Sequence, residues 1–351
     1  MNNLPIYLDS AATTPVDSRV LDAMYPYFSE IFGNASSNHI YGLQAKKAIE
    51  IARTQVAKII NADSKEILFT SGATESINLA LKGFVESNCE KGNHIITVKT
   101  EHKAVLSTCE YLETKGFEVT YLDVDTNGLI SLDELKNAIK KTTILIAIMY
   151  VNNEIGIIQP IAEIGKIAQE QKICFFCDAT QAVGKVKVDV LADYIDILCF
   201  SGHKLNAPKG IGVLYKKSNI ELTPLLHGGS QENGLRAGTY NTPLIVGLGK
   251  ACELVTLEFK KKIKETLKIK KIFEKEIEEN KIGEVCFKNI KRAPHISCIK
   301  LNTIEADNFL ISNSKKFIAS NGSACNFSLI EVSHVYKEIF KEPKKIIRIS
   351  F

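Results

Sequence analysis

The sequence lacks any apolar run of the roughly 18 residues that a membrane-spanning helix requires. Its opening segment, MNNLPIYLDSAATTP, contains no basic cluster followed by an apolar stretch, so it does not read as a secretory signal. Internal repeats and low-complexity linkers are absent as well. We therefore expect a cytoplasmic protein that uses no membrane as a partner.

A strong excess of one charge is also missing. The 44 basic and 40 acidic residues leave a net charge of only +4, which argues against nucleic acid as the main partner. A small molecule or another protein is the expected ligand. With 351 residues, 45% of them hydrophobic, the chain is long enough for a large domain and a smaller one.

The nine cysteines form an odd set without a regular framework, as expected where thiols stay reduced. Cys174 and Cys177 have the spacing of a redox or metal motif. We reject that interpretation because both fall in an apolar strand, where side chains three residues apart point to opposite faces, and no second ligand pair follows. No metal site is expected.

Short apolar runs alternate with amphipathic stretches from about residue 15 to residue 250, which predicts an α/β fold with a mainly parallel sheet covered by helices. The predicted strands are Glu66–Ser71, His94–Val98, Glu118–Leu122, Thr143–Met149, Cys174–Cys177 and Ile195–Phe200. The predicted helices between them are Leu43–Ile60, Thr74–Asn88, Ser131–Lys140 and Ile161–Gln171.

The pattern changes near residue 255, where a Lys/Glu-rich helix is predicted over Leu257–Asn280. A strand at Ile296–Leu301, a helix near Ile304–Ser312 and a small-residue loop at Ser320–Ser328 follow. We expect a large domain over residues 15–255. Residues 1–14 and 256–351 should form a smaller α+β domain.

Lys204 lies in the segment Ser201-Gly-His-Lys204, directly after an apolar strand. An amine held among small residues beyond a strand end suits a Schiff base, because a planar ring can approach it closely. The alternative is a polar turn with Lys204 in solvent. Other segments favour the first interpretation.

The segment Ser71–Ser76, SGATES, ends one strand and opens the next helix. The backbone N–H groups around Ala73 and Thr74 would then point outward and form a phosphate cradle. The same residues also suit an ordinary helix N-cap, so this segment alone is weak evidence for a phosphate site. Further phosphate ligands would come from Thr74, Ser201, His203 and Thr239.

Asp178 follows a solidly apolar strand, where an isolated carboxylate would be costly unless it is paired. Paired with a pyridinium N–H, it would keep such a ring electron-withdrawing; as a mere N-cap it would need no partner. His102 lies just past another strand. It is either a satisfied structural histidine or a group that stacks on a bound ring and transfers protons.

Cys325 differs from the other cysteines because it lies in a run of small and polar residues, Ser320–Ser328. Such a run indicates an accessible loop, where a cysteine is a reasonable nucleophile. From its local sequence alone, nucleophile and incidental thiol remain equally good interpretations.

Together these segments resemble the cysteine desulfurases of the NifS/IscS type, which are fold type I pyridoxal-phosphate enzymes of the class V aminotransferase kind. The matching motifs occur in family order over nearly the whole chain: Tyr7–Pro15, Thr70–Ser76, Thr100–Val105, Val151–Gly156, Asp178–Gln181, the Lys204 segment, Arg236–Thr239, Gly322–Cys325 and Ile347–Ser350. The resemblance implies a large domain with a seven-stranded sheet, and a homodimer.

The resemblance also implies a role for each matching residue. Lys204 would bind pyridoxal 5'-phosphate, His102 would stack on the ring, Asp178 would pair with its nitrogen and Gln181 with its phenolic oxygen. The residues implied at the phosphate are Ala73, Thr74, Ser201, His203 and, from the other subunit, Thr239. Asn153 and Arg348 would bind the substrate carboxylate, and Asn153 would also contact the cofactor. Cys325 would take sulfur from L-cysteine as a persulfide and release L-alanine.

The implied sulfur acceptor is another protein, typically an iron–sulfur scaffold. The chain departs from the family in ending directly after Phe351, where relatives usually continue through further helices. Two other functions stay open on the sequence: a selenocysteine lyase or other pyridoxal-phosphate activity, and a weakly active sulfur-relay partner.

Overall fold

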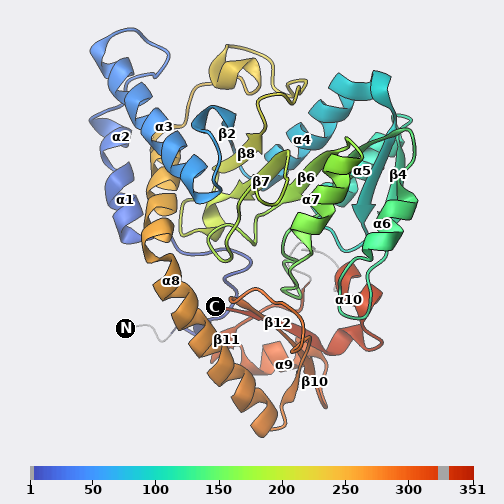
Figure 1. The fold of residues 1–351 in the computed structure, drawn as a ribbon. Helices are drawn as coiled ribbons and strands as arrows, with labels where there is room; N and C mark the ends of the chain where they lie inside the picture. The colour runs from blue at the N-terminus through green and yellow to red at the C-terminus, as the bar shows by residue number, and fades with distance from the viewer. Residues whose placement is uncertain (1–3, 323–331) are drawn as a thin grey trace.

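A seven-stranded sheet forms the centre of the computed structural model, which describes residues 4–322 and 332–351 (Figure 1). Its strand order is β2-β8-β7-β6-β5-β3-β4. The strands are β2 (Ile67–Thr70), β3 (His94–Val98), β4 (Glu118–Leu122), β5 (Thr143–Ala147), β6 (Cys174–Asp178), β7 (Ile197–Ser201) and β8 (Gly212–Lys216). Only β8 runs antiparallel to its neighbours β2 and β7. The predicted mainly parallel α/β fold is confirmed.

Helices cover both faces of this sheet. The helices of this part are α1 (Ser18–Met24), α2 (Pro26–Ser29), α3 (Ile40–Ile59), α4 (Ala73–Asn88), α5 (Lys103–Glu113), α6 (Leu132–Ala138) and α7 (Ile161–Glu170). Helix α7 shows why they dock: Ile161, Ile164, Ile167 and Ala168 recur at helical spacing and are buried. Residues of α4 and α5 pack on one face, and residues of α1, α3, α6 and α7 pack on the other.

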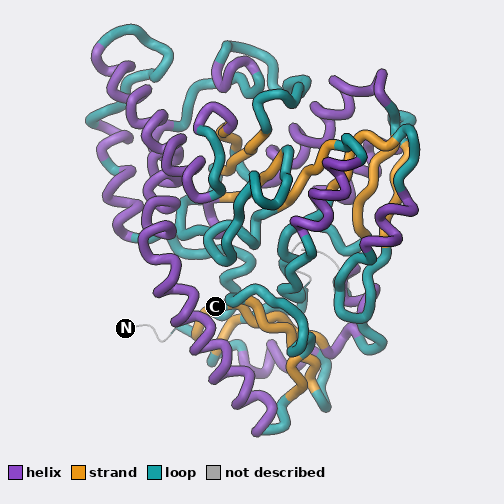
Figure 2. The backbone as a smooth tube through the Cα atoms, viewed as in Figure 1, coloured by secondary structure: helices purple, strands orange, loops and turns teal. Residues whose placement is uncertain are grey.

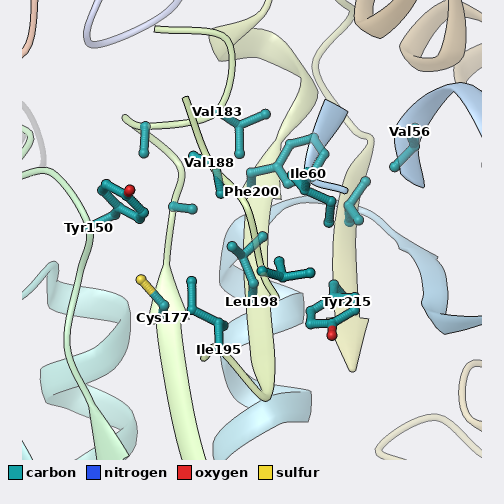
Figure 3. Close-up of a cluster of buried hydrophobic side chains, with 14 of the residues drawn as sticks. Val56, Ile60, Tyr150, Cys177, Val183, Val188, Ile195, Leu198, Phe200 and Tyr215 are labelled. Carbon is teal, nitrogen blue, oxygen red and sulfur yellow. The ribbon is translucent and has the colours of Figure 1, made fainter. Parts of the chain in front are cut away.

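Strand β6 contributes to the hydrophobic core on both sides of the sheet. Cys174 and Phe176 belong to the cluster under α4 and α5, whereas Phe175 and Cys177 belong to the opposite cluster, part of which Figure 3 shows. This alternation follows from the two-residue period of a strand. The two cysteines therefore face opposite sides of the sheet, as predicted. Among the described residues, no cluster of potential metal ligands occurs.

The C-terminal part is a smaller layer of strands and helices. Its antiparallel sheet contains β9 (Gly283–Val285), β10 (Ile296–Leu301) and β12 (Ile346–Ser350), in the order β12-β10-β9. The N-terminal β1 (Ile6–Tyr7) pairs in parallel with β11 (Phe317–Ile318). The helices α9 (Ala306–Asn313) and α10 (His334–Ile339) complete this part. The N-terminal strand is thus paired with a strand from the last third of the chain.

Helix α8 (Thr242–Glu279) connects the two parts without a break (Figures 1 and 2). The helix begins at Thr242, whereas the sequence predicted a start at Leu257. The Asn241 side chain caps its N-terminus, and a proline lies in its first turn. Its Lys-rich stretch is mostly exposed, but Lys270 is buried and donates to the carbonyl oxygen of Ala293 at 2.9 Å. Because α8 passes through residue 255, the domain division there stays a prediction.

No helix in the described ranges, 4–322 and 332–351, combines the length and the apolar character that crossing a bilayer demands.

Candidate active site

A cavity of about 500 Å³ lies beyond the carboxyl ends of β2, β3, β5, β6 and β7. This is the edge of a parallel sheet at which ligands usually bind. The predicted site residues that line it are Ala73, Thr74, His102, Asn153, Asp178, Gln181, Ser201, His203, Lys204 and Arg348. The fold therefore brings together residues from Ala73 to Arg348, which lie far apart in the sequence.

Two predicted residues do not belong to this set. Thr239 is exposed and does not line the cavity of this chain. Cys325 lies outside the described residues. The roles suggested for both remain predictions.

Lys204 reaches the cavity from the short 3-10 helix η3 (Gly202–Lys204), which directly follows β7. Its Nζ donates to the carbonyl oxygens of Ala11 at 2.6 Å and Ala12 at 2.5 Å. The turn is compact, because a Cβ on Gly202 would lie 2.8 Å from the Ile211 side chain. The amine is thus held at the wall of the cavity by the N-terminal segment.

The cavity is closed at one end by the first turn of α4. Gly72 occupies the N-cap position, and no side chain in the described part of the chain caps this helix. The backbone approaches closely here, since a Cβ on Gly212 would lie only 2.5 Å from the Gly72 Cα. An uncapped helix N-terminus with small residues is a suitable cradle for a phosphate group.

Polar side chains surround this cradle. Ser201 is buried at the end of β7, and the Nδ1 atom of His203 lies 3.1 Å from the Thr13 hydroxyl. Burial, together with the charges of Lys204 and Lys209, lowers the pKa of His203 to about 4. His203 is therefore neutral at pH 7, and one of its ring nitrogens carries a proton that can be donated to an anion.

Glu75 also lines the cavity beside the cradle, which the sequence did not indicate. Burial raises the pKa of its carboxyl group, but hydrogen bonds from Arg236 and Ser71 outweigh that effect, so the pKa is lowered overall. Arg236 Nε donates to it at 2.9 Å and the Ser71 N–H at 2.7 Å. The pairing with Arg236 offsets a negative charge that would otherwise repel a phosphate.

Asp178 stands at the end of β6 and is only 6% exposed. Its Oδ1 accepts from the Thr180 N–H at 2.9 Å. A second carboxyl group, Glu101, is buried nearby; burial, and then the charge of Asp178, raise the pKa of Glu101 well above its usual value. Asp178 lines the cavity and Glu101 does not, so Asp178 is the carboxyl group at the cavity wall that suits a cationic ring N–H.

His102 forms the N-cap of α5, where its Nδ1 accepts from the Ala104 N–H at 3.1 Å. Burial lowers the pKa of His102; Asp178 raises it, and Lys204 lowers it further. The neutral imidazole consequently carries its proton on Nε2. The ring is oriented by its own helix, so one nitrogen stays available to a ligand in the cavity.

Gln181 is held in one orientation by two buried hydrogen bonds. Its Nε2 donates to the carbonyl oxygen of Ala11 at 2.9 Å, and its Oε1 accepts from His295 Nε2 at 3.0 Å. Burial lowers the pKa of His295 far below its usual value, so this ring is neutral. His295 was not singled out from the sequence, because a lone histidine before a strand carries no recognisable motif.

Arg348, on β12, reaches the cavity from the C-terminal part of the chain. Its Nη2 donates to Asp9 Oδ1 at 2.6 Å and its Nη1 to the carbonyl oxygen of Asn153 at 2.9 Å. A guanidinium has five N–H donors, so donors remain for a carboxylate in the cavity. Asp9 is a further functional candidate that sequence reasoning missed.

Comparisons with known proteins agree with this geometry. The aminotransferase class-V family model matches residues 6–351. The cysteine desulfurase IscS of Neisseria gonorrhoeae is 51% identical over 340 residues, which are 95% of this chain and 83% of that protein. A solved structure of a NifS-like protein superposes with a TM-score of 0.91 at 34% identity, covering 99% of this chain and 94% of the other. A structure of SspA in complex with cysteine gives 0.86 at 40% identity, covering 99% and 98%. The chain therefore belongs to the class-V aminotransferase family, among the cysteine desulfurases of the IscS type.

Proposed function

We propose that this protein removes sulfur from L-cysteine with pyridoxal 5'-phosphate held on Lys204, and that Cys325 accepts the sulfur. One observation carries the proposal: a single cavity combines the Lys204 amine with an uncapped helix N-terminus, the buried carboxylate of Asp178 and the guanidinium of Arg348. The relatives named cysteine desulfurase and the SspA complex with cysteine support the choice of substrate.

The residues of the cavity fit the cofactor on which this family depends. Lys204 would hold it covalently, and the α4 N-terminus with Ala73, Thr74, Ser201 and His203 would hold its phosphate. Asp178 would pair with the ring nitrogen, Gln181 and Asn153 would contact the ring substituents, and His102 would stack on its face. When bound, pyridoxal phosphate supplies an electron sink that stabilises negative charge next to the substrate's α-carbon.

The protein's own groups would bind the amino acid and move its protons. Arg348 would receive the substrate carboxylate with the donors that Asp9 and Asn153 leave available. His102, neutral because of its burial, would exchange a proton through Nε2. Lys204 would exchange the α-proton once its amine is released, since the carbonyl oxygens of Ala11 and Ala12 hold that amine at the cavity wall.

The sulfur step would occur at Cys325. Its thiolate would attack the substrate sulfur, so that an S–S bond forms and the bond between Cβ and sulfur breaks with its electron pair left on carbon. Protonation of that carbon gives L-alanine, and the enzyme keeps a persulfide. Cysteine and the enzyme thiol thus give alanine and the persulfide, without any external oxidant.

We infer a homodimer that passes the persulfide sulfur to an acceptor protein, such as an iron–sulfur scaffold, in the cytoplasm. Large apolar side chains are exposed on and around α1 to α3, namely Leu21, Tyr25, Phe28, Phe32, Ile40 and Tyr41. Such a surface favours burial against a second copy, and light scattering would measure the mass directly. The eight described cysteines form no disulfide, which supports a reducing compartment.

Incubation with pyridoxal phosphate, L-cysteine and dithiothreitol should yield alanine and sulfide in equal amounts. The measurement is amino-acid analysis together with sulfide determination over the same time course. Release of pyruvate instead of alanine would contradict the proposal, because the carbon left behind would then have lost its amino group.

Replacing Arg348 with lysine should raise the KM for L-cysteine about tenfold or more and change kcat less, because charge-assisted hydrogen bonds of about 1.5–3 kcal/mol to the substrate are lost. Steady-state kinetics over a wide range of cysteine concentrations would show this. Arg19→Lys is the matched control: Arg19 is exposed and pairs with Asp17 and Glu258 outside the cavity. An unchanged KM in Arg348→Lys would remove Arg348 from the substrate site.

A further inference from the structure

Glu154 follows the cavity residue Asn153 and is a buried carboxylate, with 5% of its surface exposed. Its backbone N–H donates to Asn152 Oδ1 at 2.9 Å, so a hydrogen bond within the turn holds the backbone at Glu154. Its Oε2 accepts a short hydrogen bond from the Ser333 hydroxyl. Ser333 is itself buried and caps α10, accepting from the Val335 N–H at 3.1 Å.

The same carboxylate oxygen also lies close to Gly322. This glycine has a φ of +84°, and a Cβ on it would lie 2.6 Å from Glu154 Oε2 and 2.7 Å from the ring of Tyr336. Its N–H donates to the Ser320 hydroxyl at 3.0 Å. Ser320 in turn exchanges two backbone hydrogen bonds with Arg348, at 3.2 and 2.7 Å.

Gly322 precedes Cys325 by three residues, and Ser333 follows it by eight. One carboxyl group therefore lies close to Gly322 on one side of the cysteine and accepts a hydrogen bond from Ser333 on the other. The Asn153 carbonyl beside it accepts from Arg348, whose backbone pairs with Ser320. The contacts at Glu154 are thus continuous with the wall of the active site.

Burying this carboxylate is costly, and the surrounding groups compensate for it only in part. Burial raises the pKa of Glu154 to about 7, although Ser333, Arg348 and Lys103 lower it. Burial, and to a smaller extent the charge of Glu154, raise the pKa of Tyr336 and of Cys298. Replacing a buried charged group and its partners with apolar residues of similar volume is often neutral or stabilising, so packing alone does not require a carboxyl group here. The hydrogen bond from Ser333 is therefore the contact that indicates a role for Glu154.

We propose that Glu154 is a positioning residue for sulfur transfer, which holds the chain at Gly322 and at Ser333 against the loop that bears Asn153. This inference rests on the proposed role of Cys325. Glu154 acts through the Ser333 hydroxyl and through its close approach to Gly322. It does not touch the substrate.

The test compares variants that remove the hydrogen bond with variants that keep it. Ser333→Ala and Glu154→Ala should lower kcat for L-cysteine about fivefold to tenfold, as expected for one lost buried hydrogen bond, and leave KM within about twofold. Ser333→Thr and Glu154→Gln keep a donor and an acceptor, and should stay within about twofold of the unchanged protein.

A second measurement does not require the cofactor to be bound. The rate at which iodoacetamide alkylates Cys325 in the cofactor-free protein, followed by peptide mass spectrometry, should rise about threefold or more in the two alanine variants and not in the two conservative ones. Ser131→Ala is the matched control, because Ser131 caps α6 by the same type of bond, at 3.2 Å to the Glu134 N–H, and does not line the cavity.

The outcomes separate the two proposals. If Ser333→Ala and Glu154→Ala keep both the unchanged kcat and the unchanged alkylation rate while Cys325→Ala is inactive, the positioning role is wrong and the nucleophile stands. If the conservative variants lose as much kcat as the alanine variants, the hydrogen bond is not the cause and the inference also fails. Full turnover by Cys325→Ala would instead refute the proposed function on which the inference rests.

Discussion

Lys204→Ala should lose desulfuration of L-cysteine by on the order of a thousandfold or more, the scale seen when an enzyme loses its covalent catalytic group. The variant lacks the amine that we propose holds the cofactor and exchanges the α-proton, and the carbonyl oxygens of Ala11 and Ala12 lose their donor. The variant should also lose visible absorbance after gel filtration. Spectra and alanine release, recorded on the same samples, measure both effects.

Lys166→Ala provides the control for this result. Lys166 is an exposed lysine on α7, outside the cavity. It should keep both the absorbance and the rate of the unchanged protein. A Lys204→Ala protein that retained a covalently bound chromophore would show that another lysine binds the cofactor.

Cys325→Ala should abolish formation of the enzyme persulfide and reduce sulfide release from L-cysteine by about a hundredfold or more, because the variant lacks the thiolate that we propose as the nucleophile. The cavity residues are unchanged, so binding of the cofactor should persist. Mass spectrometry after incubation with cysteine should find the added sulfur on the Cys325 peptide of the unchanged protein only.

Cys89→Ala is the matched control, since Cys89 is exposed and does not line the cavity. It should turn over normally. A Cys325→Ala protein with full activity on cysteine would disprove the nucleophile. Full activity restricted to selenocysteine would favour the selenocysteine lyase alternative, because selenium departs without a thiol acceptor more readily.

Much of the fold was predictable because most strands of the large sheet are buried along their length. The buried strand His94–Val98 has the boundaries that the sequence predicted. The partly exposed edge strand Glu118–Leu122 has its predicted boundaries as well. The gathering of Lys204, Asp178 and His102 at one cavity followed from a single rule, that the carboxyl ends of parallel strands share an edge.

Other features depend on tertiary contacts that local patterns do not encode. Strand β8 was not predicted because it opens at Gly212 among small residues and is antiparallel to its neighbours. The pKa shifts of Glu101 and His295 arise mainly from burial, which becomes known only once the fold is assembled. The pairing of Asp9 with Arg348 joins residues from opposite ends of the chain, so no local sequence pattern predicts it.

Strand β8 contributes no side chain to the cavity, yet it determines the geometry there. It is hydrogen-bonded to β2, which leads to Gly72, and to β7, which leads to Lys204. The separation between these two segments is therefore set by a shared backbone register, and a slip of one residue would turn every buried side chain of a strand to the wrong face. Transfer of this site to another protein scaffold would therefore require a strand equivalent to β8 in addition to the residues that line the cavity.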